Sequence, residues 1–194
     1  DSRFNDGAVD PNGRLWVGTL NSEHRADNGL YCLHAGNSLM AADTGIVASN
    51  GIAWHPDGTR LYFVDSRART IYVYNYQATT AEITNRRIFA QTDAEPGVPD
   101  GIAVDIAGHL VCAFWDGWQL VRYDASGQII ERIKMPIARP TACAYGGSDL
   151  KTLYITSARH GLSSKALSSQ PNAGFLFART MHTPGLPITF SSSI

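Results

Sequence analysis

The sequence lacks an excess of charge of either sign. Its 16 Lys and Arg residues nearly balance 17 Asp and Glu residues, which leaves a formal net charge of −1. So small a charge excludes the basic surface with which general nucleic-acid-binding proteins neutralise phosphates. Long apolar runs are also missing: the longest, residues 110–115, falls far short of the roughly 20 residues that a helix needs to span a bilayer. We therefore expect neither a nucleic-acid nor a membrane partner.

Cysteine is scarce, and several catalytic signatures are absent. Cys32, Cys112 and Cys143 are far apart and form neither a C-x-x-C pair nor a zinc-ligand pattern. We expect them to be buried free thiols, which would fit a reducing, cytoplasmic compartment. The sequence contains no G-x-S-x-G elbow, no phosphate-binding P-loop and no H-E-x-x-H motif. These absences argue against the common serine hydrolases, nucleotide-binding enzymes and zinc proteases.

Short apolar segments separated by turn residues dominate the chain. Hydrophobic residues make up 44% and aromatic residues 10% of the sequence, enough for a core and too many for a disordered chain. Eighteen Gly and nine Pro residues interrupt these segments. Alternation with period two, as in residues 70–76, is common, whereas no helical period is evident. The sequence therefore predicts an all-β chain with many turns, ending with a late strand over residues 173–178.

Four segments of the sequence resemble one another. Their equivalent positions are Gly7, Gly51, Gly101 and Ala142. Each continues through a short strand, a turn and a second strand, as in residues 51–65. A period of about 40–50 residues with several strands in each repeat is typical of β-propeller blades. Because the first repeat begins at once, we expect the chain to be part of a longer polypeptide.

An Asn or Asp residue directly precedes the equivalent glycine in three repeats. These residues are Asp6, which follows Asn5, then Asn50 and Asp100, whereas the fourth repeat has Thr141. The first strands of propeller blades converge on a central channel, so these oxygens would meet there and suit a hard divalent cation. The alternative is that these pairs are ordinary Asn-Gly and Asp-Gly turns.

Two charged residues near the first repeat are further candidates. Arg3 lies two residues before Asn5, so alternation places both on one face of an extended strand. Glu23 follows the strand of the same repeat, in a loop. Taken alone, both residues are best interpreted as ordinary surface charges.

The motifs together resemble those of a known family. The segments at 3–19, 50–54, 99–105 and 153–158 occur in the order found in the gluconolactonase/regucalcin (senescence marker protein) family. The similarity extends over residues 3–178. It implies a six-bladed β-propeller that binds one divalent cation (Ca²⁺, Mg²⁺, Mn²⁺ or Zn²⁺) in its channel. It also implies hydrolysis of a sugar lactone to the aldonic acid.

The resemblance also assigns roles to the candidate residues. By position, Asn50 and Asp100 match the family's metal ligands, and Asp100 matches its general base. Arg3, Asn5 and Glu23 match positions that contact the substrate. The family's third protein ligand is a Glu in a preceding blade, a segment that this sequence does not contain.

The resemblance further indicates the domain organisation. We expect residues 1–194 to form a single propeller domain of four blades, without the first one to two blades of the family. Two alternatives stay open. One is a non-catalytic propeller that binds Ca²⁺ or another protein, and the other is a related propeller hydrolase acting on other esters or on organophosphates. The residues do not identify the lactone or the oligomeric state.

Overall fold

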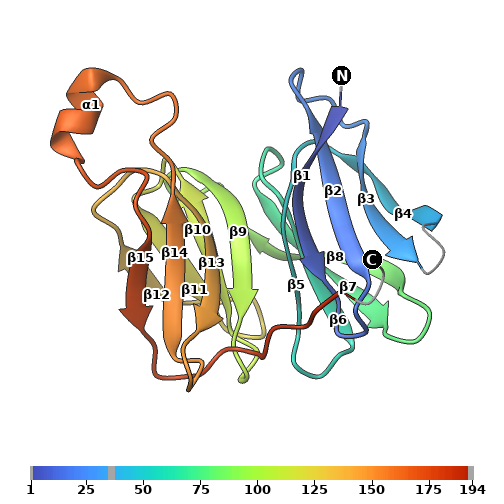
Figure 1. Cartoon of the computed structure of the whole chain (residues 1–194). Coiled ribbons are helices and arrows are strands. Elements are labelled where there is room, and N and C mark those ends of the chain that lie inside the picture. The colour runs from blue at the N-terminus through green and yellow to red at the C-terminus, as the bar shows by residue number, and fades with distance from the viewer. Residues whose placement is uncertain (1, 35–37, 192–194) are drawn as a thin grey trace. The chain divides into compact units, whose positions relative to one another are not determined.

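Antiparallel strands in four sheets form almost all of the regular structure (Figure 1). The computed structural model describes residues 2–34 and 38–191. The chain divides into two compact units, one made of residues 1–91 with 187–194 and the other of residues 92–186. Within the described ranges, every helix is too short or too polar to cross a membrane.

The first unit contains two four-stranded meanders, in which each strand pairs with the next along the chain. The first sheet consists of β1 (Ser2–Val9), β2 (Leu15–Asn21), β3 (Asn28–His34) and β4 (Ser38–Ile46). The second sheet consists of β5 (Ser49–Trp54), β6 (Arg60–Asp65), β7 (Thr70–Gln77) and β8 (Glu82–Gln91).

The second unit contains a four-stranded and a three-stranded meander. The third sheet consists of β9 (Val98–Val104), β10 (Leu110–Trp115), β11 (Gln119–Tyr123) and β12 (Ile129–Lys134). The fourth consists of β13 (Pro140–Gly146), β14 (Thr152–Ser157) and β15 (Phe177–Thr180), with the helix α1 (Ser164–Ser169) between its last two strands.

The four sheets are the four repeats of the sequence. The equivalent positions Gly7, Gly51, Gly101 and Ala142 all lie in the first strand of a sheet, so the prediction of four blades is confirmed. The second strand predicted within residues 51–65 is β6. Gly13 and Gly58 adopt positive φ angles of 84° and 69° in the turns that follow β1 and β5, as the Asn-Gly and Asp-Gly turn signals predict.

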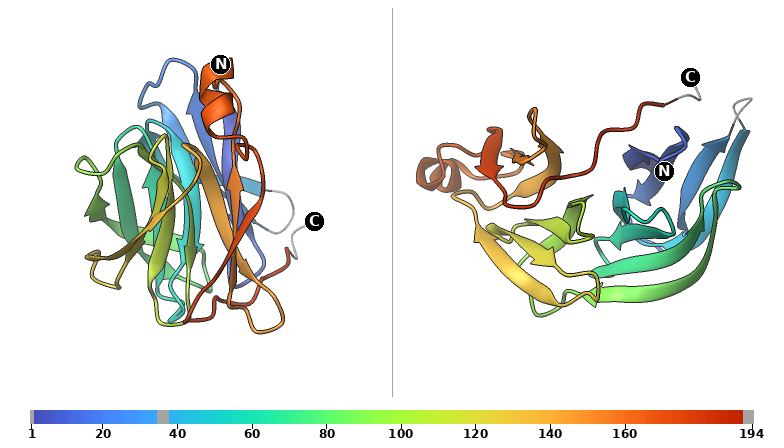
Figure 2. Two further views of the ribbon diagram at one scale, coloured as in Figure 1. Left: turned by 90° about the vertical axis from the view of Figure 1, so that its left-hand side faces the viewer. Right: turned by 90° about the horizontal axis from the view of Figure 1, so that it is seen from below.

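The segment between β14 and β15 differs from the prediction. The six-residue helix α1 lies beyond the end of β14 (Figures 1 and 2) and is capped by the Ser163 side chain, which accepts a hydrogen bond from the Ala166 amide. Six residues are too few to display a helical period. The strand predicted over residues 173–178 begins only at Phe177, because residues 171–174 form a turn in which Gly174 has a φ of 89°.

An aromatic cluster fills the core between the first and second sheets. Trp16 of β2, Trp54 of β5 and Tyr76 of β7 meet edge to face, with ring centroids 6.0–6.1 Å apart, a favoured geometry for aromatic pairs. The buried residues around them include Leu30, Cys32, Ile46, Ile52, Leu61, Phe63 and Tyr74. This core fixes the position of β1 and β5, on which the candidate site is built.

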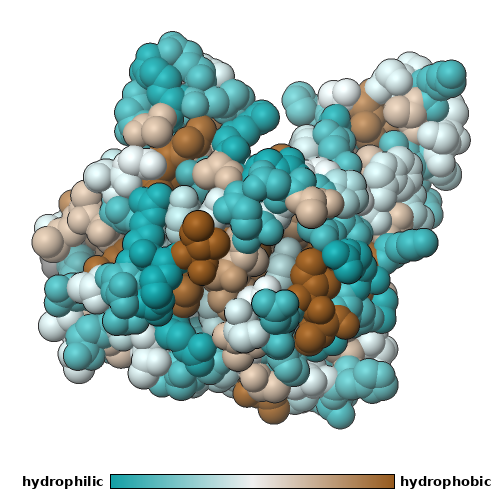
Figure 3. Space-filling view, turned by 180° about the vertical axis from the view of Figure 1, so that it is seen from behind, coloured by the Kyte–Doolittle hydropathy of each residue, from teal (hydrophilic) through white to brown (hydrophobic). Residues whose placement is uncertain are grey.

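The second unit has a core of its own, and the three thiols are buried. That core gathers Val111, Ala113, Leu120, Ile133, Ile137, Leu153 and Ile155, among others. Cys32, Cys112 and Cys143 are buried and remain thiols, which confirms the expectation for them. On the face shown in Figure 3, hydrophobic residues form separate spots among hydrophilic ones.

Candidate active site

The Asn-Gly and Asp-Gly pairs of the repeats lie inside strands and not in turns. Asp6-Gly7 is part of β1, Asn50-Gly51 of β5 and Asp100-Gly101 of β9. All three glycines lie outside the set of positive-φ residues. These pairs are therefore not tight turns, although the Asp6 carboxylate does accept a local hydrogen bond from the Gly7 amide, as Asx residues commonly do. Their recurrence has another physical cause.

Close packing of neighbouring strands is one such cause. A Cβ atom on Gly101 would lie 2.7 Å from the Cα atom of Ala142 in β13, and one on Gly7 would lie 2.9 Å from the carbonyl oxygen of Trp16. Distances below 3 Å are too short for carbon atoms in contact, so a side chain at either position would push two backbones apart. Close packing explains why these positions are glycine, but it does not explain why an Asn or Asp precedes them.

The predicted substrate residues of β1 are joined to β5 by hydrogen bonds. Arg3 Nη1 donates to Asn5 Oδ1 at 3.0 Å and to the Phe4 carbonyl at 2.9 Å. Asn5 Nδ2 in turn donates to the Ser49 carbonyl at 2.8 Å, directly before Asn50. The side chains of Arg3 and Asn5 thus share one face, as the alternation predicts, and both are exposed at the start of β1. The guanidinium is held in place and stays accessible to a ligand.

Asn50 is oriented by a hydrogen bond of its own. Its Nδ2 donates to Ser66 Oγ at 3.1 Å, and the residue is half-buried at the start of β5. Because the amide nitrogen is the atom bonded to Ser66, this bond fixes the orientation of the amide group and leaves its oxygen out of that contact. An oriented amide oxygen next to the Arg3–Asn5 pair is a donor that a hard cation accepts. The sequence pattern around Asn50 does not predict this bond, because Ser66 lies after β6, in another part of the repeat.

Glu23 lies in the loop after β2 and is paired with a neighbour. Its carboxylate accepts a hydrogen bond from Arg25, whose Nε also donates to Asp27 at 2.9 Å. The register places Arg3 opposite Leu20, so this loop follows the end of β2 that carries Arg3. The bonds of the Glu23 carboxylate run to Arg25 and not to Arg3 or Asn5. Arg25 is a residue of this region that the sequence analysis did not single out.

Asp6 has a perturbed carboxyl group. Burial raises the pKa of Asp6, and a 2.8 Å hydrogen bond from the Gly7 amide opposes that rise only in part. A raised pKa means that its environment favours the neutral acid. A cation bound nearby would favour the ionised carboxylate instead.

Asp100 belongs to the second unit, where it is the third residue of β9 and is half-buried. Pairing of Val98 with Trp115 places the end of β10 beside the start of β9. In this region the Arg139 guanidinium lies 4.8 Å from the centroid of the Trp115 ring and donates from Nε to Asp116 at 2.6 Å. The end of β10 beside β9 is thus contacted by a cation that Asp116 holds in place.

The predicted residues therefore fall into two groups. Arg3, Asn5 and Asn50 are brought together in the first unit, with Glu23 nearby on the same sheet but bound to Arg25. Asp100 lies in the second unit. Over residues 2–34 and 38–191, no three His, Cys, Asp or Glu side chains gather in a way that could hold a metal ion. The metal ligands proposed from the sequence are the Asn50 amide and the Asp100 carboxylate. They include only one of these four residue types, so they do not form a group of this kind.

Solved structures define the class of protein. The crystal structure of regucalcin from Agrobacterium tumefaciens, described as a calcium-binding protein, is 30% identical to this chain and superposes with a TM-score of 0.91, covering 97% of this chain and 64% of that one. The luciferin-regenerating enzyme superposes with a TM-score of 0.89 at 29% identity, over 98% of this chain and 65% of that one. The protein is thus an all-β propeller, represented here by four blades.

The family follows from the sequence comparison. Residues 1–159 match the model of the SMP-30/Gluconolactonase/LRE-like region, and the chain belongs to that family. Bovine regucalcin is 34% identical over 195 residues, covering 96% of this chain and 65% of the relative. Pentonolactonase XacC of Haloferax volcanii is 39% identical over 157 residues, covering 81% and 54%. The chain thus spans about 65% of the length of the regucalcins that it matches.

Proposed function

We propose that this chain is part of a divalent-metal-dependent hydrolase that opens a sugar lactone to the aldonic acid. The observation that carries the proposal is the hydrogen-bonded connection from Arg3 through Asn5 to the backbone beside Asn50. It gathers on two adjacent strands three residues that the family resemblance assigns to substrate and metal. Membership of a family that includes a pentonolactonase supports the choice of substrate class.

Asn50 and Asp100 would hold the cation. Their amide and carboxylate oxygens are the ligand types that Ca²⁺, Mg²⁺ and Mn²⁺ prefer. When bound, such a cation acts as a Lewis acid that polarises the lactone carbonyl. The oxygen ligands of Asn50 and Asp100 are of the type that such a cation binds. The third ligand implied by the family resemblance has no counterpart in this chain.

The chain's own groups account for the proton transfers and for binding. Asp100 would accept a proton from the water molecule whose oxygen forms the new bond to the carbonyl carbon. As the bond between that carbon and the ring oxygen breaks, the proton passes from Asp100 to the leaving oxygen. This balances the reaction and restores the carboxylate.

Substrate binding would fall to the first sheet. Arg3 presents a planar set of donors suited to the oxygens of the sugar, and its bond to Asn5 limits its freedom before the substrate arrives. Asn5 and Glu23 would bind hydroxyl groups. Because Glu23 is paired with Arg25, its carboxylate would have to share or exchange that partner when substrate binds.

Hydrolysis assays test the proposal. The chain is incubated with five- and six-carbon aldonolactones and with aryl esters, with Ca²⁺, Mg²⁺ or Mn²⁺ and with EDTA. We expect lactone hydrolysis that requires the cation and falls on the order of 10²-fold or more in Asp100→Asn. Arg3→Ala should mainly raise KM. Asn12→Ala serves as the control, because Asn12 is an exposed amide in the turn after β1, bonded to the Ala78 carbonyl.

Three results would contradict the proposal. One is lactone hydrolysis that persists at the wild-type rate in EDTA or in Asp100→Asn. Another is a preference for aryl esters, which would favour the related propeller hydrolases. The third is cation binding without hydrolysis of any lactone, which would favour the non-catalytic alternative.

A further inference from the structure

A second cluster of chemically active side chains lies in the first unit, away from the candidate active site. A cavity of about 290 Å³ opens between the β3–β4 end of the first sheet and the turn from β7 to β8. Cys32 and His34 line it from β3, Met40 from β4 and Glu82 from β8. The catalytic proposal uses none of these four residues.

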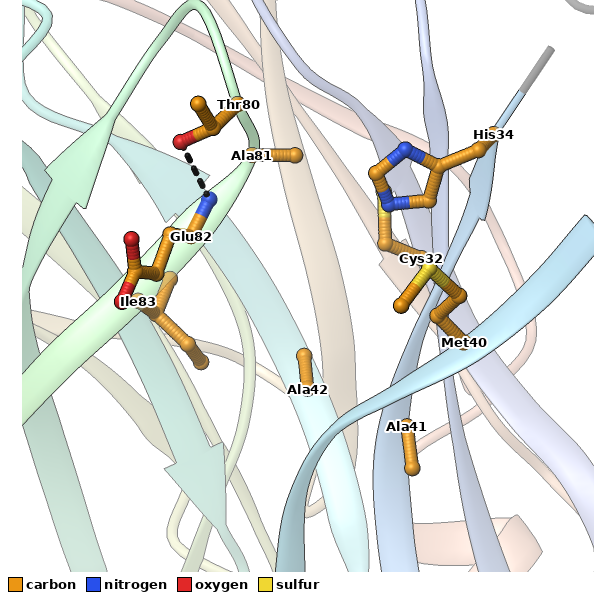
Figure 4. Close-up of a pocket in the computed structure, with 9 residues that line it drawn as sticks. All are labelled: Cys32, His34, Met40, Ala41, Ala42, Thr80, Ala81, Glu82 and Ile83. Carbon is orange, nitrogen blue, oxygen red and sulfur yellow. Dashed lines mark hydrogen bonds between the residues drawn. The ribbon is translucent and has the colours of Figure 1, made fainter.

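The strand register brings three of these side chains to one face. Cys32 pairs directly with Met40 across the antiparallel β3–β4 ladder, and His34 follows Cys32 by two residues. Directly opposed residues have Cβ atoms about 5 Å apart, and residues two apart on a strand share a face. Figure 4 shows His34, Cys32 and Met40 on one side of the cavity, across from Glu82 and Ile83.

The cluster is remote from the candidate active site within the same sheet. Arg3 is opposite Leu20, near one end of β2, whereas Leu15 at the other end is opposite Leu33 on β3. Cys32 and His34 flank Leu33. The two sets of residues therefore occupy opposite ends of the first sheet, and a ligand at one end does not contact the other.

The donor atoms define the class of ligand. A thiol, a thioether and an imidazole together are a soft donor set, which selects Cu(I) over the hard cations that oxygen ligands prefer. The hard oxygen donors at the cavity, the Glu82 carboxylate and the Thr80 hydroxyl, lie on the other side of it (Figure 4). We propose that Cys32, His34 and Met40 bind one Cu(I) ion at this cavity.

Binding would require the thiol to lose its proton. The unliganded thiol is protonated at neutral pH, as cysteine thiols ordinarily are. On binding, the S–H bond would break, a sulfur–copper bond would form and the proton would pass to solvent. Affinity should therefore increase as the pH rises, with about one proton released for each ion bound.

Met40 offers the cleanest test. It is 55% exposed, and replacing Met by Leu nearly preserves volume, so Met40→Leu should fold normally. Met135→Leu is the matched control, since Met135 is a core residue of the other unit. In anaerobic competition with bicinchoninate, we expect one Cu(I) per wild-type chain. The Cu(I) affinity of Met40→Leu should be lower than that of wild type by about tenfold or more, because losing even a residue that only supports a metal ligand costs that much. The affinity of Met135→Leu should equal that of wild type.

The other ligands are tested in the same assay and by spectroscopy. Cys32→Ala should abolish binding, whereas Cys143→Ala, which alters another buried thiol, should not. X-ray absorption of the wild-type complex should show two sulfur neighbours and one nitrogen, with one sulfur lost in Met40→Leu. The proposal is overturned if the chain takes no Cu(I) from the chelator, if Met40→Leu binds like wild type, or if only nitrogen and oxygen neighbours surround the metal.

Discussion

Asp10 illustrates how a single buried charge can tie the first two sheets together. It is fully buried in the turn between β1 and β2. Its carboxylate accepts hydrogen bonds from Arg14 Nε at 2.7 Å, Trp16 Nε1 at 3.1 Å and the Tyr76 hydroxyl at 2.7 Å. Burial opposes ionisation of Asp10, but these bonds and those from backbone amides together outweigh it. They hold the pKa of Asp10 below its usual value.

This arrangement predicts a pH-dependent contribution to stability. Because the folded-state pKa of Asp10 is lower than the unfolded value of about 3.9, its contribution is complete above that value and is lost as the pH falls through the folded-state pKa. The Asn side chain of Asp10→Asn cannot ionise. Its NH₂ group is a hydrogen-bond donor, and it would face the Arg14, Trp16 and Tyr76 groups, which also donate. We expect it to lower the free energy of unfolding at pH 7 by about 3 kcal/mol. Urea unfolding at several pH values measures this.

The difference between wild type and Asp10→Asn should shrink as the pH falls from about 5 to 2. Asp149→Asn is the matched control, because Asp149 is exposed and accepts a hydrogen bond from the Lys151 amide. Its effect should be small at every pH. A stability difference for Asp10→Asn that stays constant down to pH 2 would show that the charge of Asp10 does not contribute.

Individual residues were predicted unevenly from the sequence. Alternation placed Arg3 and Asn5 on one face, and the recurrence of Asx-Gly identified Asn50 and Asp100. The turn alternative could be rejected only once the strands were known, because the same dipeptide suits a tight turn and a tightly packed strand. The pairing of Glu23 with Arg25 was not predicted, since the sequence does not fix the path of a loop.

At the scale of whole elements, the contact between β2 and β5 depends on one glycine. A Cβ atom on Gly18 of β2 would overlap both Oγ and Cβ of the fully buried Ser49 in β5. We expect Gly18→Ala to lower the free energy of unfolding by about 1–3 kcal/mol, as overpacking does. Thermal or urea unfolding measures the loss.

A second substitution should rescue this variant. Ser49→Gly removes both overlapping atoms, so Gly18→Ala combined with Ser49→Gly should be more stable than the sum of the two single effects by about 1 kcal/mol or more. Gly146→Ala is the control: its new Cβ would meet only the ring of Tyr154 at 3.0 Å, and Tyr154 is 40% exposed and can move. Strictly additive losses would mean that Gly18 and Ser49 are not in contact as described.

The elements themselves were largely predictable where they are long and periodic. The repeated order of strand, turn and strand located the first strands of all four sheets. The helix α1 was missed because its residues have no buried face to impose a period. The cluster of Cys32, His34 and Met40 was missed because it depends on the register between β3 and β4, which neither strand's pattern specifies alone.

At the scale of the whole molecule, the sequence repeat and the four observed sheets agree on four blades. The chain spans about 65% of the regucalcin relatives, and the first-blade Glu implied by the resemblance has no counterpart in it. The proposed cation site therefore rests, in this chain, on Asn50 and Asp100. These residues lie in separate units, so whether they act on one ion is the central question.

Calorimetric titration with Ca²⁺ and Mn²⁺ answers that question most directly. The cation affinity and stoichiometry are measured for the wild type, Asn50→Ala, Asp100→Ala and the double variant. We predict one cation per wild-type chain, an affinity loss of about tenfold or more in each single variant, and a double variant in which the two losses do not add. Losses of affinity that do not add are expected when both residues bind the same ion. Wild-type affinity in both single variants, or losses that add as for two independent sites, would contradict a common metal site.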